Sequence, residues 1–172
     1  MGKIIFIIGG ARSGKSNYGL EKAKEIKGRV AFIATCNPCD GEMKRRVALH
    51  RKSRPAHWKT FEVSDGIAEL VKESGSKFKV FIVECLTLLI SGFMEKKYAE
   101  AVIKDKINEM LKALKKSKSD AIIVSNEVGS GIIPQNKLAR DFLDIAGRIN
   151  QMTAKASDEA YFLVSGIPWR LK

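Results

Sequence analysis

The sequence predicts an α/β fold, with a mostly parallel, doubly wound sheet flanked by helices. Two observations lead to this prediction. Five short apolar runs alternate with helical patterns along the chain, and a glycine-rich loop directly follows the first run. The runs lack the alternation of a one-sided sheet, which is typical of parallel strands covered on both faces. They span residues 4–8, 30–34, 78–83, 121–124 and 160–164.

The first run, Ile4–Ile8, leads straight into the glycine loop, so we interpret it as a buried strand and not as a signal peptide. No apolar run approaches the ~20 residues that a membrane span needs. The cytoplasm is therefore the expected location. With 172 residues, of which 45% are hydrophobic, the chain suits one domain over residues 1–172 with one core.

Helices are predicted between the strands. One begins near Lys15, where the glycine loop ends. Another is predicted over Gly41–Ser53, with Asp40 as its candidate N-cap.

Apolar stripes at helical spacing indicate two further helices. The stripes run through residues 103, 107, 110 and 114 and through residues 138, 142, 145, 149 and 152. The second of these helices is expected from about Asn136 to Ser157. Residues 165–171 predict a turn into a short edge strand, because Pro168 fits poorly in a central strand.

The glycine-rich loop matches the phosphate-binding P-loop pattern. It comprises Gly9, Gly10, Ala11, Arg12, Ser13, Gly14, Lys15 and Ser16. The glycines let backbone N–H groups turn around phosphate oxygens, and the following helix adds the positive end of its dipole. We expect Lys15 to reach the β- and γ-phosphates and Ser16 to hold Mg²⁺. An ordinary glycine turn is the alternative, but the strand–loop–helix context favours a nucleoside triphosphate site.

A P-loop enzyme also needs an acidic side chain near the metal, usually at the end of a neighbouring strand. The apolar run Val80–Val83 ends in Glu84, which we expect to bind Mg²⁺ or its water shell. The alternative is a strand-end acid exposed to solvent. Asn126 and Glu127 follow a strand that ends at Ser125, at the same edge of a parallel sheet. They would contact the metal, orient the substrate or serve structure only.

Two histidines occur in the chain, His50 and His57. His50 shares a face of the predicted helix with Met43 and Val47, so periodicity alone favours a packed or surface histidine. Basic residues surround it in sequence, at positions 46, 51, 52 and 54. Such cations would keep the imidazole neutral at pH 7, and a neutral imidazole is a competent nucleophile toward phosphorus. The same cations would stabilise a departing pyrophosphate.

The net charge of +12 fits either a lysine-rich solvated surface or an anionic partner, which would be a nucleotide, a phosphorylated substrate or a nucleic acid. Three cysteines without a secretion signal argue against a disulfide scaffold. Cys36 and Cys39 have the spacing of a metal or redox site, but no second such pair exists. A turn that carries two thiols is the favoured interpretation.

Further blocks, in order along nearly the whole chain, carry a resemblance to a known family. They lie at residues 33–35, 40–50, 54–62, 84–87, 125–134, 138–142, 147–151 and 164–166. Through them the sequence resembles the bifunctional adenosylcobinamide kinase / adenosylcobinamide-phosphate guanylyltransferase family of cobalamin biosynthesis. The P-loop alone is generic, whereas Arg54-Pro55-Ala56-His57-Trp58 and Asn126-Glu127-Val128-Gly129-Ser130-Gly131-Ile132-Ile133-Pro134 make the resemblance specific.

The resemblance implies two reactions, a core similar to the RecA type and a homotrimer. The first reaction transfers the γ-phosphoryl group of ATP or GTP to the aminopropanol hydroxyl of adenosylcobinamide. The second transfers GMP from GTP to adenosylcobinamide phosphate through a GMP-histidine intermediate, which gives adenosylcobinamide-GDP and pyrophosphate. The residue that matches the histidine is His50, and Lys15 and Glu84 are the other expected catalytic residues.

The guanine-nucleotide contacts that the resemblance implies fall on the P-loop and on residues farther along the chain. These are Thr35, Cys36, Asn37, Arg51, Lys52, Ser53, Arg54, Glu62 and Glu84. Two features depart from the family pattern: residues 36–39 carry two cysteines, and some relatives have aspartate where Glu84 stands. His57 is interpreted as a structural residue or as one that contacts the site residues rather than the substrate.

Two other interpretations stay open from the sequence. A kinase-only enzyme would use the P-loop, with His50 merely packing its helix. A RecA-like nucleic-acid-binding ATPase would explain the charge, but no aromatic stacking platform or known nucleic-acid module accompanies the lysines. The expected partners are therefore adenosylcobinamide, its phosphate and a nucleoside triphosphate, with no nucleic acid.

Overall fold

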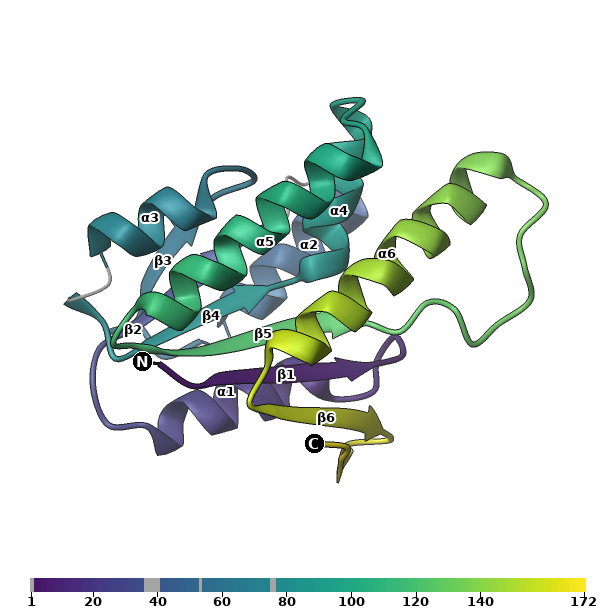
Figure 1. The fold of residues 1–172 in the computed structure, drawn as a ribbon. Helices are drawn as coiled ribbons and strands as arrows, with labels where there is room; N and C mark the ends of the chain where they lie inside the picture. Colours follow the sequence, from purple (N-terminus) through teal and green to yellow (C-terminus); the bar gives the residue numbers. More distant parts are fainter. Residues whose placement is uncertain (1, 36–40, 53, 75–76) are drawn as a thin grey trace.

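One seven-stranded sheet takes its strands from nearly the whole length of the chain (Figure 1). The computed structural model describes residues 2–35, 41–52, 54–74 and 77–172, and within 41–52 the side chains of residues 41, 42, 45, 47, 48 and 51. The strands are β1 (Ile4–Gly9), β2 (Val30–Ala34), β3 (Lys59–Glu62), β4 (Val80–Glu84), β5 (Asp120–Asn126), β6 (Glu159–Val164) and β7 (Ile167–Arg170). Their order is β3-β2-β4-β5-β1-β6-β7, with β6–β7 antiparallel and the other pairs parallel.

Helices cover both faces of the sheet. They are α1 (Lys15–Glu25), α2 (Gly41–Lys52), α3 (Ile67–Ser74), α4 (Leu86–Glu95), α5 (Glu100–Lys116) and α6 (Lys137–Ala156). α1 packs against one face through Leu20 and Ala23, whereas α3, α4, α5 and α6 bury their apolar sides on the other. The predicted doubly wound, P-loop NTPase-like α/β fold is thus confirmed. No helix in the described part of the chain is long and apolar enough to cross a bilayer.

The five predicted strands all form, because their apolar side chains fill the two layers of core between sheet and helices. β1, an interior strand between β5 and β6, is buried along its whole length. Several strand boundaries differ from the prediction by one or two residues. β4 begins at Val80 rather than Phe78, and β5 runs through Asn126, so Asn126 belongs to the strand rather than following it.

Three elements are present that the apolar patterns did not predict. β3 lies at the sheet edge and alternates only weakly between exposed and half-buried positions, so its four residues carry no clear strand pattern. α3 has eight residues, too few for a repeated stripe. α4 is apolar on several sides, and a continuous apolar segment of this length has no periodicity that distinguishes helix from strand.

The predicted helices all form. α6 extends from Lys137 to Ala156, and the side chain of Asn136 accepts a hydrogen bond from the N–H of Ala139 at 3.1 Å, which caps the helix. α2 extends over Gly41–Lys52. Its candidate cap, residue 40, and residue 53 lie outside the described residues.

The C-terminal segment forms the predicted turn and edge strand. β7 pairs with β6 and places Pro168 opposite Leu163 at the free edge of the sheet, where the missing N–H of proline costs no ladder hydrogen bond.

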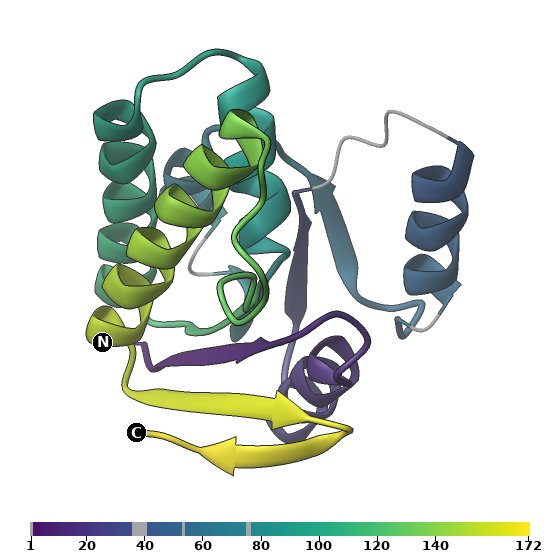
Figure 2. The same cartoon turned by 90° about the vertical axis from the view of Figure 1, so that its right-hand side faces the viewer.

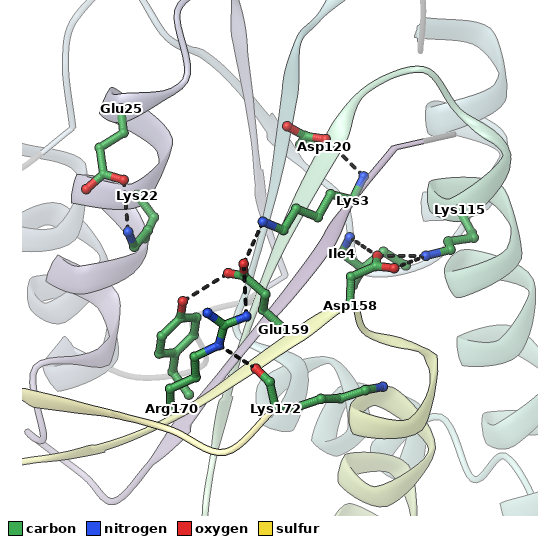
Figure 3. A network of polar contacts seen from close by, with 11 residues as sticks. Lys3, Ile4, Lys22, Glu25, Lys115, Asp120, Asp158, Glu159, Arg170 and Lys172 are labelled. Atoms are coloured by element: carbon green, nitrogen blue, oxygen red, sulfur yellow. Dashed lines mark hydrogen bonds and ion pairs between the residues drawn. The ribbon is translucent and has the colours of Figure 1, made fainter.

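A network of charged side chains ties the amino ends of β1 and β6 to their surroundings (Figure 3). Asp158 accepts hydrogen bonds from the Ile4 N–H at 2.8 Å and from the Lys115 ammonium at 2.7 Å. These contacts, the Ile4 N–H foremost, hold the pKa of Asp158 below its ordinary value. Beside it, the Lys3 ammonium lies 2.6 Å from a Glu159 carboxylate oxygen and lowers the pKa of Glu159. The network therefore lies at the amino ends of the strands, whereas the P-loop lies at the carboxyl end of β1.

Replacing Asp158 with asparagine should lower the free energy of unfolding at pH 7 by about 1 kcal/mol, because a charge-assisted bond becomes a neutral one at a partly exposed site. Since the folded-state pKa is depressed, the stabilisation is present above the unfolded pKa and is lost as the pH falls through the folded pKa. Urea denaturation at neutral and at acid pH measures it, with the exposed Asp105→Asn as the control. An equal difference between wild type and variant at both pH values would contradict this account.

Candidate nucleotide-binding site

The P-loop connects the buried end of β1 to the first turn of α1. Gly14, which precedes α1, has a φ of 90°, a conformation that glycine adopts without strain. A Cβ atom at Gly9 would lie 2.6 Å from the Leu163 carbonyl oxygen and 2.6 Å from Ser13 Oγ, so the chain needs glycine there too. Ser13 Oγ is itself buried and has no hydrogen-bond partner within the described residues. A phosphate oxygen in the loop would supply one.

Lys15 is the buried cation of the loop. Its ammonium donates a hydrogen bond to the Gly10 carbonyl oxygen at 2.9 Å, across the loop. Burial lowers the pKa of Lys15, while the neighbouring Cys85 and Glu84 oppose that shift. An ammonium group that is partly stripped of water interacts strongly with an incoming phosphate.

Glu84 ends β4 and meets the P-loop directly. Ser16 Oγ donates a hydrogen bond to Glu84 Oε1. This bond joins the first turn of α1 to β4, which is separated from β1 by β5 in the sheet. Hydroxyl and carboxylate oxygens suit Mg²⁺, which usually completes its shell with waters and substrate phosphates. The described residues contain no group of three His, Cys, Asp or Glu side chains that would hold a metal without the substrate.

Thr35 braces the backbone just after Glu84. Its hydroxyl accepts a hydrogen bond from the Cys85 N–H and donates one to the Cys85 carbonyl oxygen, both at 2.8 Å. The Thr35 N–H also donates to the Glu84 carbonyl oxygen at 3.0 Å. Thr35 was predicted to contact the nucleotide. In this structure its hydroxyl is instead bonded to the N–H and the carbonyl oxygen of Cys85.

Asn126 and Glu127 have different surroundings. The Asn126 amide donates a hydrogen bond to Thr87 Oγ1 at 2.8 Å, next to the end of β4. The Glu127 carboxylate accepts one from the Gly129 N–H at 2.6 Å and so stabilises the turn that follows β5. Asn126 therefore lies among the strand ends of the candidate site, whereas Glu127 is bonded to its own loop.

Arg54 interacts with three other charged side chains, those of Glu84, Arg51 and Glu62. Its guanidinium carbon lies 3.5 Å above the centre of the Phe32 ring, and its Nε is buried without a hydrogen-bond partner in the described part of the chain. Burial lowers the pKa of Arg54; Glu84 opposes that shift, Arg51 adds to it and Glu62 opposes it. The ladder aligns Ala34 with both Glu62 and Glu84, so the two carboxylates flank β2 at one level.

Comparison with known proteins decides the family. A sequence model described as cobinamide kinase / cobinamide phosphate guanyltransferase matches residues 5–171. The chain belongs to this family. The Escherichia coli (strain K12) protein named bifunctional adenosylcobalamin biosynthesis protein CobU is 35% identical over 181 residues, which cover 98% of this chain and 99% of the relative. The protein of the same name from Salmonella typhimurium is 36% identical with the same coverage.

A third relative in the cobinamide kinase / cobinamide phosphate guanyltransferase family is the Pseudomonas aeruginosa protein named bifunctional adenosylcobalamin biosynthesis protein CobP. It is 36% identical over 166 residues, which cover 96% of this chain and 95% of the relative. The similarity to these relatives spans nearly their full length, so the family predicted from the sequence is confirmed.

α2 is the helix that carries His50, the residue predicted to form the GMP-histidine intermediate of guanylyl transfer. α2 links β2 to β3, on the same side of the P-loop as Glu84, and Figure 2 shows it standing at one side of the molecule. Arg51 on this helix is exposed. The side chains of His50 and Lys52 lie outside the described residues, as do the predicted nucleotide contacts Cys36, Asn37 and Ser53.

Two residues near the cobinamide kinase P-loop were not predicted as site residues from the sequence. Thr87, in the first turn of α4, is buried against Asn126 and Cys85. Gly166 donates its N–H to the Ser13 carbonyl oxygen at 2.9 Å, inside the P-loop. Gly166 had a local signal, a serine–glycine pair between two strand patterns, which is typical of a tight hairpin turn. Thr87 had no comparable local signal, although both residues lie in blocks that carry the family resemblance.

Proposed function

We propose that the protein phosphorylates adenosylcobinamide with ATP or GTP and then transfers GMP from GTP to adenosylcobinamide phosphate. The names of the family and of the relatives support both activities. One observation carries the proposal: Lys15, Ser16 and Glu84 lie together at the P-loop. Glu84 ends β4, on the same side of β1 as β2 and β3, the strands that α2 connects. The products of the second reaction are adenosylcobinamide-GDP and pyrophosphate.

In the phosphoryl transfer, the chain positions the triphosphate and neutralises its charge. Backbone N–H groups of the P-loop and the Lys15 ammonium bind the β- and γ-phosphates. Ser16 and Glu84 are the residues that would hold Mg²⁺, which supplies further positive charge to the phosphate oxygens when bound. The substrate hydroxyl oxygen bonds to the γ-phosphorus and its proton passes to water, while the bond from that phosphorus to the β–γ bridging oxygen breaks to release the nucleoside diphosphate.

In the guanylyl transfer, a ring nitrogen of His50 bonds to the α-phosphorus of GTP, and the bond to the α–β bridging oxygen breaks to release pyrophosphate. The P-loop binds that pyrophosphate, and Arg51 and Arg54 add positive charge on the same side. A phosphate oxygen of adenosylcobinamide phosphate then bonds to the same phosphorus, which frees His50. Glu62 lies beside Arg54, where it would help to hold the guanosine part.

Labelled GTP tests the proposal. Incubated alone with [α-³²P]GTP and Mg²⁺, the protein should retain label that survives alkali and is lost in acid, whereas [γ-³²P]GTP should leave none. With cobinamide present, the γ-label should appear in cobinamide phosphate. Label transfer to cobinamide without any α-labelled protein or pyrophosphate release would instead indicate a kinase-only enzyme.

Replacing Glu84 with glutamine should lower both activities about a hundredfold and raise the Mg²⁺ concentration needed for half-maximal rate. Glutamine keeps an oxygen that accepts from Ser16, so the change removes mainly the negative charge. Initial rates over a Mg²⁺ titration measure the effect, and the exposed Glu95→Gln is the control. Wild-type rates at low Mg²⁺ in the variant would remove Glu84 from the metal site.

We further propose, on the family resemblance, that the protein acts in the cytoplasm as a homotrimer that binds no nucleic acid. Light scattering of the purified protein at several concentrations tests the trimer. Retention of the protein on immobilised DNA at physiological salt would contradict the last point.

A further inference from the structure

The tip of the β6–β7 hairpin touches the P-loop. The two-residue turn Ser165–Gly166 has φ values of 51° and 82°, as expected for the tight turn that joins two antiparallel strands. The Gly166 N–H donates to the Ser13 carbonyl oxygen at 2.9 Å. A Cβ atom on Gly14 would lie 3.0 Å from the Gly166 Cα, so the two backbones are in contact. Figure 2 shows the hairpin tip next to the P-loop end of β1.

The hairpin and Glu84 lie on opposite sides of the P-loop. In the sheet, β5 and then β4 follow β1 on one side, and β6 and then β7 follow it on the other. Glu84 and Ser16, which bond to each other, are the residues that would hold the cation of the terminal phosphates in the proposed function. A nucleotide whose γ-phosphate lies at that side extends its nucleoside away from β4, across the P-loop and toward the hairpin.

The hairpin tip has an exposed apolar surface. Val164 and Ile167 are cross-strand neighbours beside the turn, so their side chains share one face. Both are exposed, at 53% and 70%. An apolar surface of this kind suits the face of a purine ring, and it offers no side-chain amide or carboxylate that would distinguish adenine from guanine.

We propose that the hairpin tip, formed by residues 164–167, is a second nucleoside subsite, which binds the purine of the nucleotide that donates its γ-phosphate. The inference rests on the proposed function and extends it. For guanylyl transfer, the α-phosphorus must face α2, so the guanosine lies on the β2–β3 side. For phosphoryl transfer, the nucleoside lies on the β6–β7 side and the γ-phosphate lies at Glu84. One P-loop then serves two reactions because the nucleotide binds it in two directions.

A double variant with Val164→Thr and Ile167→Thr tests the subsite, because threonine keeps the β-branched shape that strands favour and removes apolar contact. The affinity for ADP should fall about tenfold while the affinity for pyrophosphate stays unchanged, since only the nucleoside loses contacts. In steady state, the KM for ATP in cobinamide phosphorylation should rise by a similar factor with kcat maintained. GTP saturation of the protein's own guanylylation should not change.

Leu171→Thr is the matched control, since Leu171 is exposed just beyond the end of β7, away from the turn. Unchanged ADP affinity in the double variant would overturn the inference. So would an equal loss of ADP and pyrophosphate affinity, because the turn would then only brace the P-loop. A lower molecular mass of the variant in light scattering would assign the surface to contacts between copies of the chain.

Failure of the inference can be told apart from failure of the proposed function. The comparison of ADP with pyrophosphate needs no cobinamide and no turnover. A wild-type protein that lacks either transfer would overturn the proposed function, whereas the double variant is compared with the wild type by binding alone.

Discussion

Replacing Lys15 with methionine should reduce both cobinamide phosphorylation and guanylylation of the protein by about a thousandfold. The Lys15 ammonium is a buried cation in the P-loop, with Glu84 among the groups that act on its pKa. No water can take its place at the phosphates without loss of charge. Methionine has a stem of similar length, so the fold should remain, and the free energy of unfolding should stay within about 1 kcal/mol of wild type because burial already disfavours the charged lysine.

The two rates and the affinity for pyrophosphate measure the effect of Lys15→Met. Lys24→Met, in the same helix but exposed, is the control and should leave all three unchanged. If the Lys15 variant kept more than a tenth of either activity, that reaction would not depend on the P-loop lysine. A loss of phosphorylation alone would mean that guanylyl transfer uses a separate phosphate site.

Replacing His50 with asparagine should abolish guanylylation, with a loss of at least about a thousandfold, and leave cobinamide phosphorylation within about threefold of wild type. Asparagine has no nitrogen that can form the covalent bond to phosphorus. The kinase parts lie outside α2: Lys15 bonds to Gly10 within the P-loop, and Ser16 bonds to Glu84 at the end of β4. The helix itself should fold as before.

Retention of α-³²P label on the protein and pyrophosphate release measure the effect of His50→Asn. The matched control is His57→Asn, since His57 is exposed in the segment that leads into β3, and it should keep both activities. Label that persists in the His50 variant and disappears in the His57 variant would exchange the two assignments. Loss of both reactions in the His50 variant would make it a residue of the shared phosphate site.

Much of the sheet could be predicted from the sequence because parallel strands buried on both faces are apolar throughout. The edge strand β3 could not, because its positions are half-buried or exposed and its partner contacts come from only one side. For α4 the obstacle was the opposite one. It is buried on most sides, so its sequence lacks the polar face that reveals a helical period.

The candidate site divides in the same way. The P-loop is a continuous segment with a local pattern, and Glu84 follows from the polarity change at the end of an apolar run. The contacts of Thr35 with Cys85 and of Gly166 with Ser13 join segments far apart in the chain, and nothing in the local composition of either partner indicates the other. Such contacts depend on strand order, which apolar patterns alone do not determine.

The position of β1 inside the sheet, with a strand on each side, has a consequence for how the protein is made. β1 is synthesised well before β5 and β6, the two strands that pair with it, which begin at Asp120 and Glu159. Until then, a strand of five isoleucine and phenylalanine residues followed by glycine has both hydrogen-bonding edges open. Such a segment is prone to mispairing with other chains. Protection of β1, by a chaperone or by transient local packing, would therefore favour correct folding until β5 and β6 have been made.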